Sequence, residues 1–113
     1  MTDSLADLAR ELDRFAAARN WQRFHSPKNL ASALIVEAAE LLEPFQWMTE
    51  AQSHELNAAQ REAVASEMAD VLLYLIQLGN ALDIDPVVAA KAKLAQNESR
   101  FPIDPDSAGS RGS

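Results

Sequence analysis

Two pairs of acidic residues are the part of this sequence most able to do chemistry. Glu37 and Glu40 stand three residues apart, and Glu67 and Asp70 repeat that spacing later in the chain. Residues with this spacing lie on the same side of a helix, one turn from each other. Each pair also flanks a stripe of apolar residues, so each is expected at the edge of a helix–helix contact. If the two helices face each other, four carboxylates converge.

Carboxylates that converge in a partly buried cleft repel one another and are costly to keep ionised. A divalent cation satisfies them, and ligation by oxygen atoms alone favours Mg²⁺ or Mn²⁺. The pattern therefore predicts a metal site between two helices. The alternative is that all four acids are ordinary solvent-exposed charges, as expected for Glu43 and Glu62, because this spacing also occurs on surface helices.

The sequence lacks the residues that several other kinds of catalytic site require. A di-iron carboxylate bundle needs Glu-x-x-His on its helices, whereas His25 and His54 lie in connectors and neither follows a Glu by three residues. The chain has no glycine-rich phosphate loop and no serine nucleophile elbow. It also has no cysteine, which excludes thiol chemistry and fits a cytoplasmic protein.

Four main helices are expected to position the acids, in an all-α bundle without strands. The predicted helices run over Asp3–Arg19, from Ser26-Pro27 to about Pro44, over Val64–Leu82 and over Val87–Arg100. Their start signals are a cap at Ser4 or Asp3, a cap at Ser26 before a proline, and a cap at Asp85 before a proline. Thr49–Gln60 is predicted to be a loop with a short helical turn.

The third of these helices has more than one side to bury. Its polar side carries Glu67, Asp70, Tyr74 and Gln77, next to the apolar stripe. Leu73 and Ile76 lie outside both arcs, so they need another helix, either of this chain or of a second copy. A short four-helix chain with this many apolar faces is expected to form a homo-oligomer, a dimer or a tetramer.

Length and charge limit the organisation and the partners. The chain has 113 residues and a net charge of −7. Residues 1–103 are interpreted as one domain, and 104–113 as a disordered tail that resembles a cloning remnant. The negative charge argues against a nucleic-acid polymer as partner. The longest apolar run is too short to span a membrane, so no membrane partner is expected.

Aromatic and basic residues gather in two connectors. Trp21, Phe24, His25 and Lys28 stand between the first two helices, and Trp47 follows the second helix. Bulky aromatics in a connector either anchor it to the core or form the wall of a pocket for a planar ligand, here with a basic rim. The pattern leaves both interpretations open.

Besides the two acidic pairs, in that order, four segments of the chain are distinctive: RNWQRFHSPKNL, EAAELLEPFQW, SEMADVLLYL and KAKLAQNESRFP. Through these features the chain resembles the MazG-type all-α nucleoside triphosphate pyrophosphohydrolases, and their dCTP pyrophosphatase branch in particular. The resemblance runs from about Leu5 to Pro102. A helical, oligomeric fold is implied, with active sites completed between subunits.

The resemblance also implies a reaction and its residues. A nucleoside triphosphate would be cleaved to a monophosphate and pyrophosphate, with Mg²⁺ held by the four acids. Glu37 and Glu40 are the predicted catalytic residues, with Glu40 as the general base. The residues implied to contact the nucleoside or the phosphates are Trp21, Phe24, His25, Lys28, Trp47, Tyr74, Lys93, Asn97 and Arg100.

One departure from the family pattern concerns the base. Members that act on dCTP tend to carry a histidine on the first helix, where Leu12 stands here. The resemblance therefore implies the reaction more firmly than the preferred base. The runner-up function, from another class, is a non-catalytic helical module that associates through its apolar face.

Overall fold

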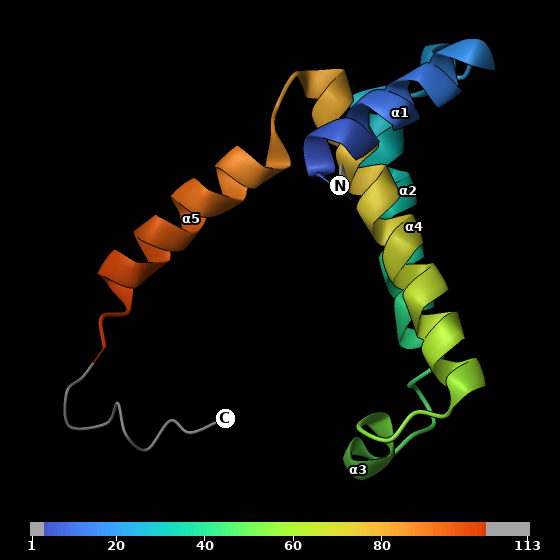
Figure 1. Cartoon of the computed structure of the whole chain (residues 1–113), viewed down its shortest axis with the longest axis vertical. Coiled ribbons are helices and arrows are strands. Elements are labelled where there is room, and N and C mark those ends of the chain that lie inside the picture. The colour runs from blue at the N-terminus through green and yellow to red at the C-terminus, as the bar shows by residue number, and fades with distance from the viewer. Residues whose placement is uncertain (1–3, 104–113) are drawn as a thin grey trace.

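The fold is built on one long antiparallel pair of helices (Figure 1). The computed structural model describes residues 4–103, and these contain helices and connectors but no strand. The elements in order are α1 (Leu5–Ala18), the short 3₁₀ helix η1 (Gln22–Phe24), α2 (Pro27–Leu42), α3 (Glu50–Ser53), α4 (Ala58–Leu82) and α5 (Pro86–Arg100). The prediction of an all-α chain is confirmed.

Helix starts follow the capping residues of the sequence. The side chain of Ser4 accepts a hydrogen bond from the Asp7 N–H, and that of Ser26 accepts one from the Asn29 N–H. Asp85 caps α5 and Pro86 is its first residue, as predicted. Asp3, the alternative first cap, lies outside the described residues, as does the tail 104–113.

One predicted boundary is wrong, because α4 begins at Ala58 rather than at Val64. Asn57 and Gln60 form a capping box, in which each side chain accepts a hydrogen bond from the other's backbone N–H, at 2.8 and 2.9 Å. This polar first turn has no apolar periodicity, so the hydrophobic pattern did not include it. Thr49 caps the short α3 in the same way, which confirms the predicted helical turn.

α2 and α4 lie side by side over most of their length, and α1 crosses the C-terminal half of α4 (Figure 1). Among residues 4–103, the buried apolar side chains are Ala16 of α1, Leu30 of α2 and Ile76 of α4. Asn80 of α4 connects the two crossing helices, because its side-chain amide donates a hydrogen bond to the Ala9 carbonyl of α1 at 3.1 Å.

The second apolar side of α4 is covered within the chain itself. Ile76 is only 1% exposed, and Leu73 shares a hollow with Leu8 and Leu12 of α1. Of the two alternatives left open, a helix of the same chain is the one that meets them.

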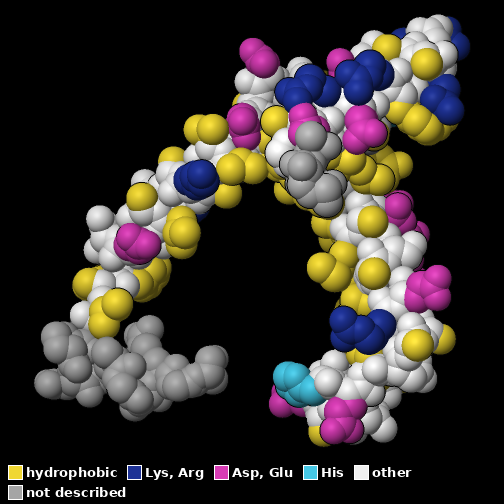
Figure 2. All heavy atoms as spheres, viewed as in Figure 1, with side chains coloured by type: hydrophobic (Ala, Val, Ile, Leu, Met, Phe, Trp, Pro, Cys, Tyr) yellow, Lys and Arg dark blue, Asp and Glu magenta, His cyan; other side chains and the backbone are white. Residues whose placement is uncertain are grey.

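α5 leaves this assembly, since the chain bends by 99° between α4 and α5. Its described side chains include none that is buried, and the inner side of the resulting arch carries many apolar side chains (Figure 2). Two almost wholly apolar hollows, about 360 and 330 Å³, lie between α4 and α5. No single helix within residues 4–103 is long and apolar enough to cross a membrane; α4 and α5 meet that length and composition only as a bent pair.

Gly79 allows the turn between α4 and α5 to close. A Cβ atom at this position would lie 2.7 Å from the backbone oxygen of Ile84 and 3.2 Å from Cγ of Pro86. We expect Gly79→Ala to lower the free energy of unfolding by about 1–2 kcal/mol, because the clash with backbone outweighs the gain of about 1 kcal/mol in helix propensity. Urea denaturation at fixed protein concentration measures this.

Asp83 provides a control of opposite sign in the same turn. It adopts a left-handed conformation with φ of 56°, which glycine occupies without a Cβ penalty. Asp83→Gly is therefore expected to raise the free energy of unfolding. A stabilising effect of Gly79→Ala would contradict this account of the turn.

Candidate functional site

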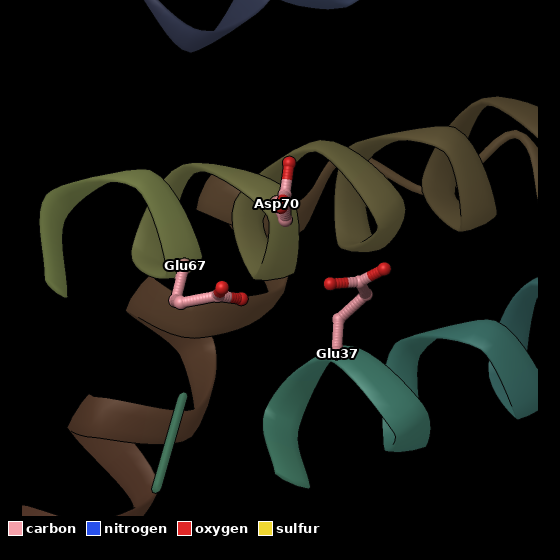
Figure 3. A group of neighbouring side chains, drawn as sticks. All are labelled: Glu37, Glu67 and Asp70. Carbon is pink, nitrogen blue, oxygen red and sulfur yellow. The ribbon is translucent and has the colours of Figure 1, made fainter. Parts of the chain in front are cut away.

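Three of the four predicted acids converge where α2 faces α4. Glu37 comes from α2, and Glu67 and Asp70 from successive turns of α4 (Figure 3). One carboxylate oxygen of each lies within 4.8 Å of one from each of the others. All three side chains are half-buried. This spacing allows a single cation to be held by three carboxylates.

Two oxygens of this cluster have no partner of their own. Oε2 of Glu37 and Oε2 of Glu67 are inaccessible to solvent, and neither receives a hydrogen bond from the residues that the structure describes. Buried carboxylate oxygens are costly when unpaired. The oxygens of acids on the surface are hydrated by solvent and do not carry this cost. The burial of these two oxygens therefore argues against the alternative that the acids are ordinary solvent-exposed charges. A metal ion is a partner that the donor set fits, because hard oxygen ligands suit a hard cation.

Electrostatics in the cluster favour protonation when no metal is present. The pKa of Glu37 is raised, first by the neighbouring Glu40, with which a hydrogen bond can form only when a proton lies between them. Burial and the negative charges of the other acids raise it further. Burial is also the main cause that raises the pKa of Glu67, and nearby carboxylates add to it.

These shifts predict how the stability of the metal-free protein depends on pH. Glu37 and Glu67 bind protons more readily when folded than when unfolded, so the free energy of unfolding falls as pH rises. This loss begins near the ordinary value of 4.5 and is complete above the raised pKa values. In EDTA, the melting temperature should therefore decrease upward from pH 4.5.

The double variant Glu37→Gln/Glu67→Gln should flatten this dependence, because neither amide titrates. Saturating Mg²⁺ should reverse the slope, since the ion competes with protons for the same oxygens. Differential scanning calorimetry across this pH range measures all three curves. A melting temperature in EDTA that rises with pH equally in both proteins would contradict the assignment.

Glu40, the fourth predicted acid, lies beside the cluster but outside the group of three. Its charge raises the pKa of both Glu37 and Glu67, so it is close to them. It belongs to the same side of α2 as Glu37, one turn later. The expected convergence of four carboxylates is therefore found for three, with the fourth adjacent.

The predicted aromatic residues are separated into two places. Trp21 packs edge-on against Phe15 of α1, with ring centroids 5.4 Å apart, and its backbone N–H donates to Ala16 at 2.9 Å. It thus anchors the connector. Trp47 is 88% exposed and follows the other end of α2, a helix of 16 residues and so about 24 Å long. Within one chain, the two tryptophans cannot enclose the same base.

The residues predicted on α5 are also apart from the acids. Lys93, Asn97 and Arg100 lie on the helix that turns away from α4 (Figure 1). Tyr74, in contrast, is half-buried on α4 one turn beyond Asp70 and on the same side. The described chain therefore brings Tyr74 next to the cluster and leaves the basic residues of α5 outside it.

A cavity with a mixed polar and apolar lining, near the N-terminal end of α2, contains residues that the sequence interpretation missed. It has a volume of about 300 Å³, and its lining includes Asp13, Gln22, His25, Gln77 and Asn80. Of these, His25 was a predicted substrate contact and Gln77 had been placed on the polar side of its helix. Asp13, Gln22 and Asn80 gave no signal. The turn after α1 brings Gln22 to Asp13, and the crossing of α1 over α4 adds Asn80.

Comparison with known proteins supports the resemblance seen in the sequence. The model of the MazG-like family matches residues 33–111. A dCTP pyrophosphatase 1 from Rattus norvegicus is 37% identical over 102 residues, and one from Homo sapiens is 39% identical over 101 residues, each alignment covering 88% of this chain. The chain spans about 60% of the length of these two relatives.

A solved structure agrees with the fold. The crystal structure of a pyrophosphatase from Archaeoglobus fulgidus matches with a TM-score of 0.82 and 38% sequence identity, covering 87% of this chain and 92% of that one. From the family model, the relatives and this fold, we conclude that the chain belongs to the MazG-like family.

Proposed function

We propose that this protein hydrolyses nucleoside triphosphates, dCTP or a related nucleotide, to the nucleoside monophosphate and pyrophosphate in a Mg²⁺-dependent reaction. The observation that carries the proposal is the cluster of Glu37, Glu67 and Asp70 with its two unpartnered buried oxygens. The relatives named dCTP pyrophosphatase 1 support the substrate class. Removal of surplus or non-standard nucleotides is the role that fits this reaction.

The residues divide the chemistry between them. A bound Mg²⁺ supplies neutralisation of the triphosphate charge and a water of lowered pKa. The carboxylates of Glu37, Glu67 and Asp70 would hold this ion. Glu40, adjacent but outside that group, accepts the proton of the water that attacks the α-phosphorus. As that bond forms, the bond from the α-phosphorus to the leaving pyrophosphate oxygen breaks, and the monophosphate remains.

We further propose that the protein acts as a homo-oligomer, at least a dimer. The support is the arch between α4 and α5, whose exposed apolar side chains include Leu75, Leu82 and Leu94. A helix such as α5, with 15 residues and no buried side chain, is marginal alone in water. A second copy that covers this face would bring its Lys93, Asn97 and Arg100 toward the acidic cluster.

A product assay tests the function. Purified protein with Mg²⁺ is incubated with ribo- and deoxynucleoside triphosphates, and the products are separated by ion-exchange chromatography. Monophosphate and pyrophosphate in equal amounts, lost on addition of EDTA, are expected. Release of inorganic phosphate instead, or no turnover of any triphosphate, would overturn the proposal. In the second case, the non-catalytic helical module would become the better explanation.

A further inference from the structure

A flank of α2 outside its contact with α4 carries an apolar stripe. Ala31, Ile35, Ala38 and Leu42 follow one another at steps of four, three and four residues, so they lie in one line along the helix. Ile35 is 72% exposed and Leu42 is 61% exposed. No member of this α2 stripe is charged. The packing of α2 against α4 therefore leaves an apolar line of α2 uncovered within residues 4–103.

The α2 stripe and the exposed apolar residues of α4 face the same side of the α2–α4 pair. At about 100° per residue, Leu42 lies about 140° around α2 from Glu37. Leu75 likewise lies about 140° around α4 from Asp70. Because Glu37 and Asp70 meet in the acidic cluster, the apolar residues of both helices lie together on the side of the pair that is turned away from it.

The α2 stripe and Met68, Leu72 and Leu75 of α4 form one broad surface, which we call the α2–α4 face. The three α4 residues are 57%, 39% and 41% exposed, and Leu72 and Leu75 also line a hollow against α5. Two helices about 10 Å wide, side by side over the 16 residues of α2, present about 480 Å². α5, with 15 residues, adds about 200 Å² beside them. This area approaches the roughly 800 Å² that each chain buries in a typical stable interface.

A second copy of the chain is the partner that the α2–α4 face fits. The chain has a net charge of −7, so two copies repel each other unless they meet through a surface without acids. The α2–α4 face meets this condition, because the acidic cluster lies on the other side of the helix pair. Small and large residues alternate along the α2 stripe, so the side chains of a second copy can interdigitate with it. Two helix pairs that meet in this way form a four-helix core.

We propose that two copies of the chain associate through the α2–α4 face, with the helix pairs of both copies packed against each other in a four-helix core. The inference rests on the homo-oligomer of the proposed function, and it adds α2 to an interface that the arch between α4 and α5 does not include. The acidic cluster stays on the outer side of this core, where a nucleotide and a metal ion can reach it. α5 is about 22 Å long, twice the width of a helix, so its far end reaches past the helix pair of the second copy.

Ile35→Asp tests this interface directly. The side chain is mostly exposed in the single chain, so the fold of one chain loses little, whereas a two-fold interface would bury the new charge once in each copy. Light scattering coupled to size exclusion should give the mass of a single chain for Ile35→Asp and of at least two chains for the wild type. Val36→Asp is the matched control. Val36 is 57% exposed and adjacent in sequence, but it lies about 100° around α2 from Ile35 and outside the stripe, so the wild-type mass should persist.

A milder variant decides the question if circular dichroism shows that Ile35→Asp does not fold. Ile35→Ala should raise the dissociation constant by about 100-fold or more in sedimentation equilibrium, because each two-fold interface loses the side chain twice. Val36→Ala should leave that constant within about two-fold of the wild type. Equal constants for the two alanine variants, or a wild-type mass for Ile35→Asp, would overturn the inference and leave an oligomer formed by the arch alone.

The mass of the wild-type protein separates this inference from the proposed reaction. A single-chain mass would overturn both the interface and the homo-oligomer, whatever the protein hydrolyses. An oligomer that Ile35→Asp dissociates supports the interface even if the product assay finds no turnover of any triphosphate. The product assay, run on the same wild-type sample, judges the reaction alone.

Discussion

Glu67→Ala should abolish hydrolysis of nucleoside triphosphates while the helices stay folded. Glu67 contributes one of the three converging carboxylates and one of the two buried oxygens without a partner. Loss of this carboxylate would weaken the binding of Mg²⁺ and disturb the position of the attacking water. We therefore expect kcat/KM to fall by about 10³-fold or more, which corresponds to about 4 kcal/mol of transition-state stabilisation. Initial rates at saturating Mg²⁺ measure this.

The same substitution has a distinctive effect on stability. It removes a carboxylate whose pKa is raised by burial and by its neighbours, so the metal-free protein should melt at the same temperature or higher. The rise in melting temperature that Mg²⁺ produces in the wild type should be largely lost. An ordinary structural residue would show the opposite, with lower stability and an intact response to Mg²⁺.

Glu62→Ala is the matched control. Glu62 is exposed, lies on the same helix and lies outside the cluster, so neither the rate nor the response to Mg²⁺ should change. Wild-type-like activity in a folded Glu67→Ala protein would remove the metal assignment. That result would favour the alternative interpretation, in which the acids are ordinary surface charges.

Leu94→Asp should dissociate the proposed homo-oligomer into single chains. Leu94 lies on α5, lines one of the two apolar hollows of the arch, and is 60% exposed in the single chain. Within one chain its replacement costs little. If a second copy covers the arch, a buried unpaired charge results, which costs several kcal/mol per interface. Light scattering coupled to size exclusion measures the mass.

Val88→Asp provides a control on the same helix. Val88 is 63% exposed, so it resembles Leu94 in exposure, but it lines neither apolar hollow. Its substitution should leave the mass of the particle unchanged. Activity should fall in Leu94→Asp and persist in Val88→Asp, because the site is proposed to need Lys93, Asn97 and Arg100 of a second copy. If the wild-type protein has the mass of a single chain, the proposed homo-oligomer is wrong.

Local signals in the chain were enough to predict most of its helices. Ser26 before a proline and Asp85 before a proline each marked a start, because a side-chain cap and a fixed proline φ act within a few residues. The spacing of Glu67 and Asp70 placed both on one side of a helix for the same reason. Only the start of α4 was misjudged, where the Asn57–Gln60 capping box precedes the apolar pattern.

The packing of these helices against one another depends on contacts between residues far apart in the chain. The hydrophobic periodicity of each helix carries no information about these contacts. Packing of α2 against α4 brings Glu37 to the acids of α4 and leaves Glu40 at the side. The crossing of α1 buries Ile76, which the pattern alone would have allowed a second copy to cover. The same crossing places Asp13 and Gln77 in one cavity, although 64 residues separate them. Helix identity is thus a local property, whereas the site arises from the angles at which the helices meet.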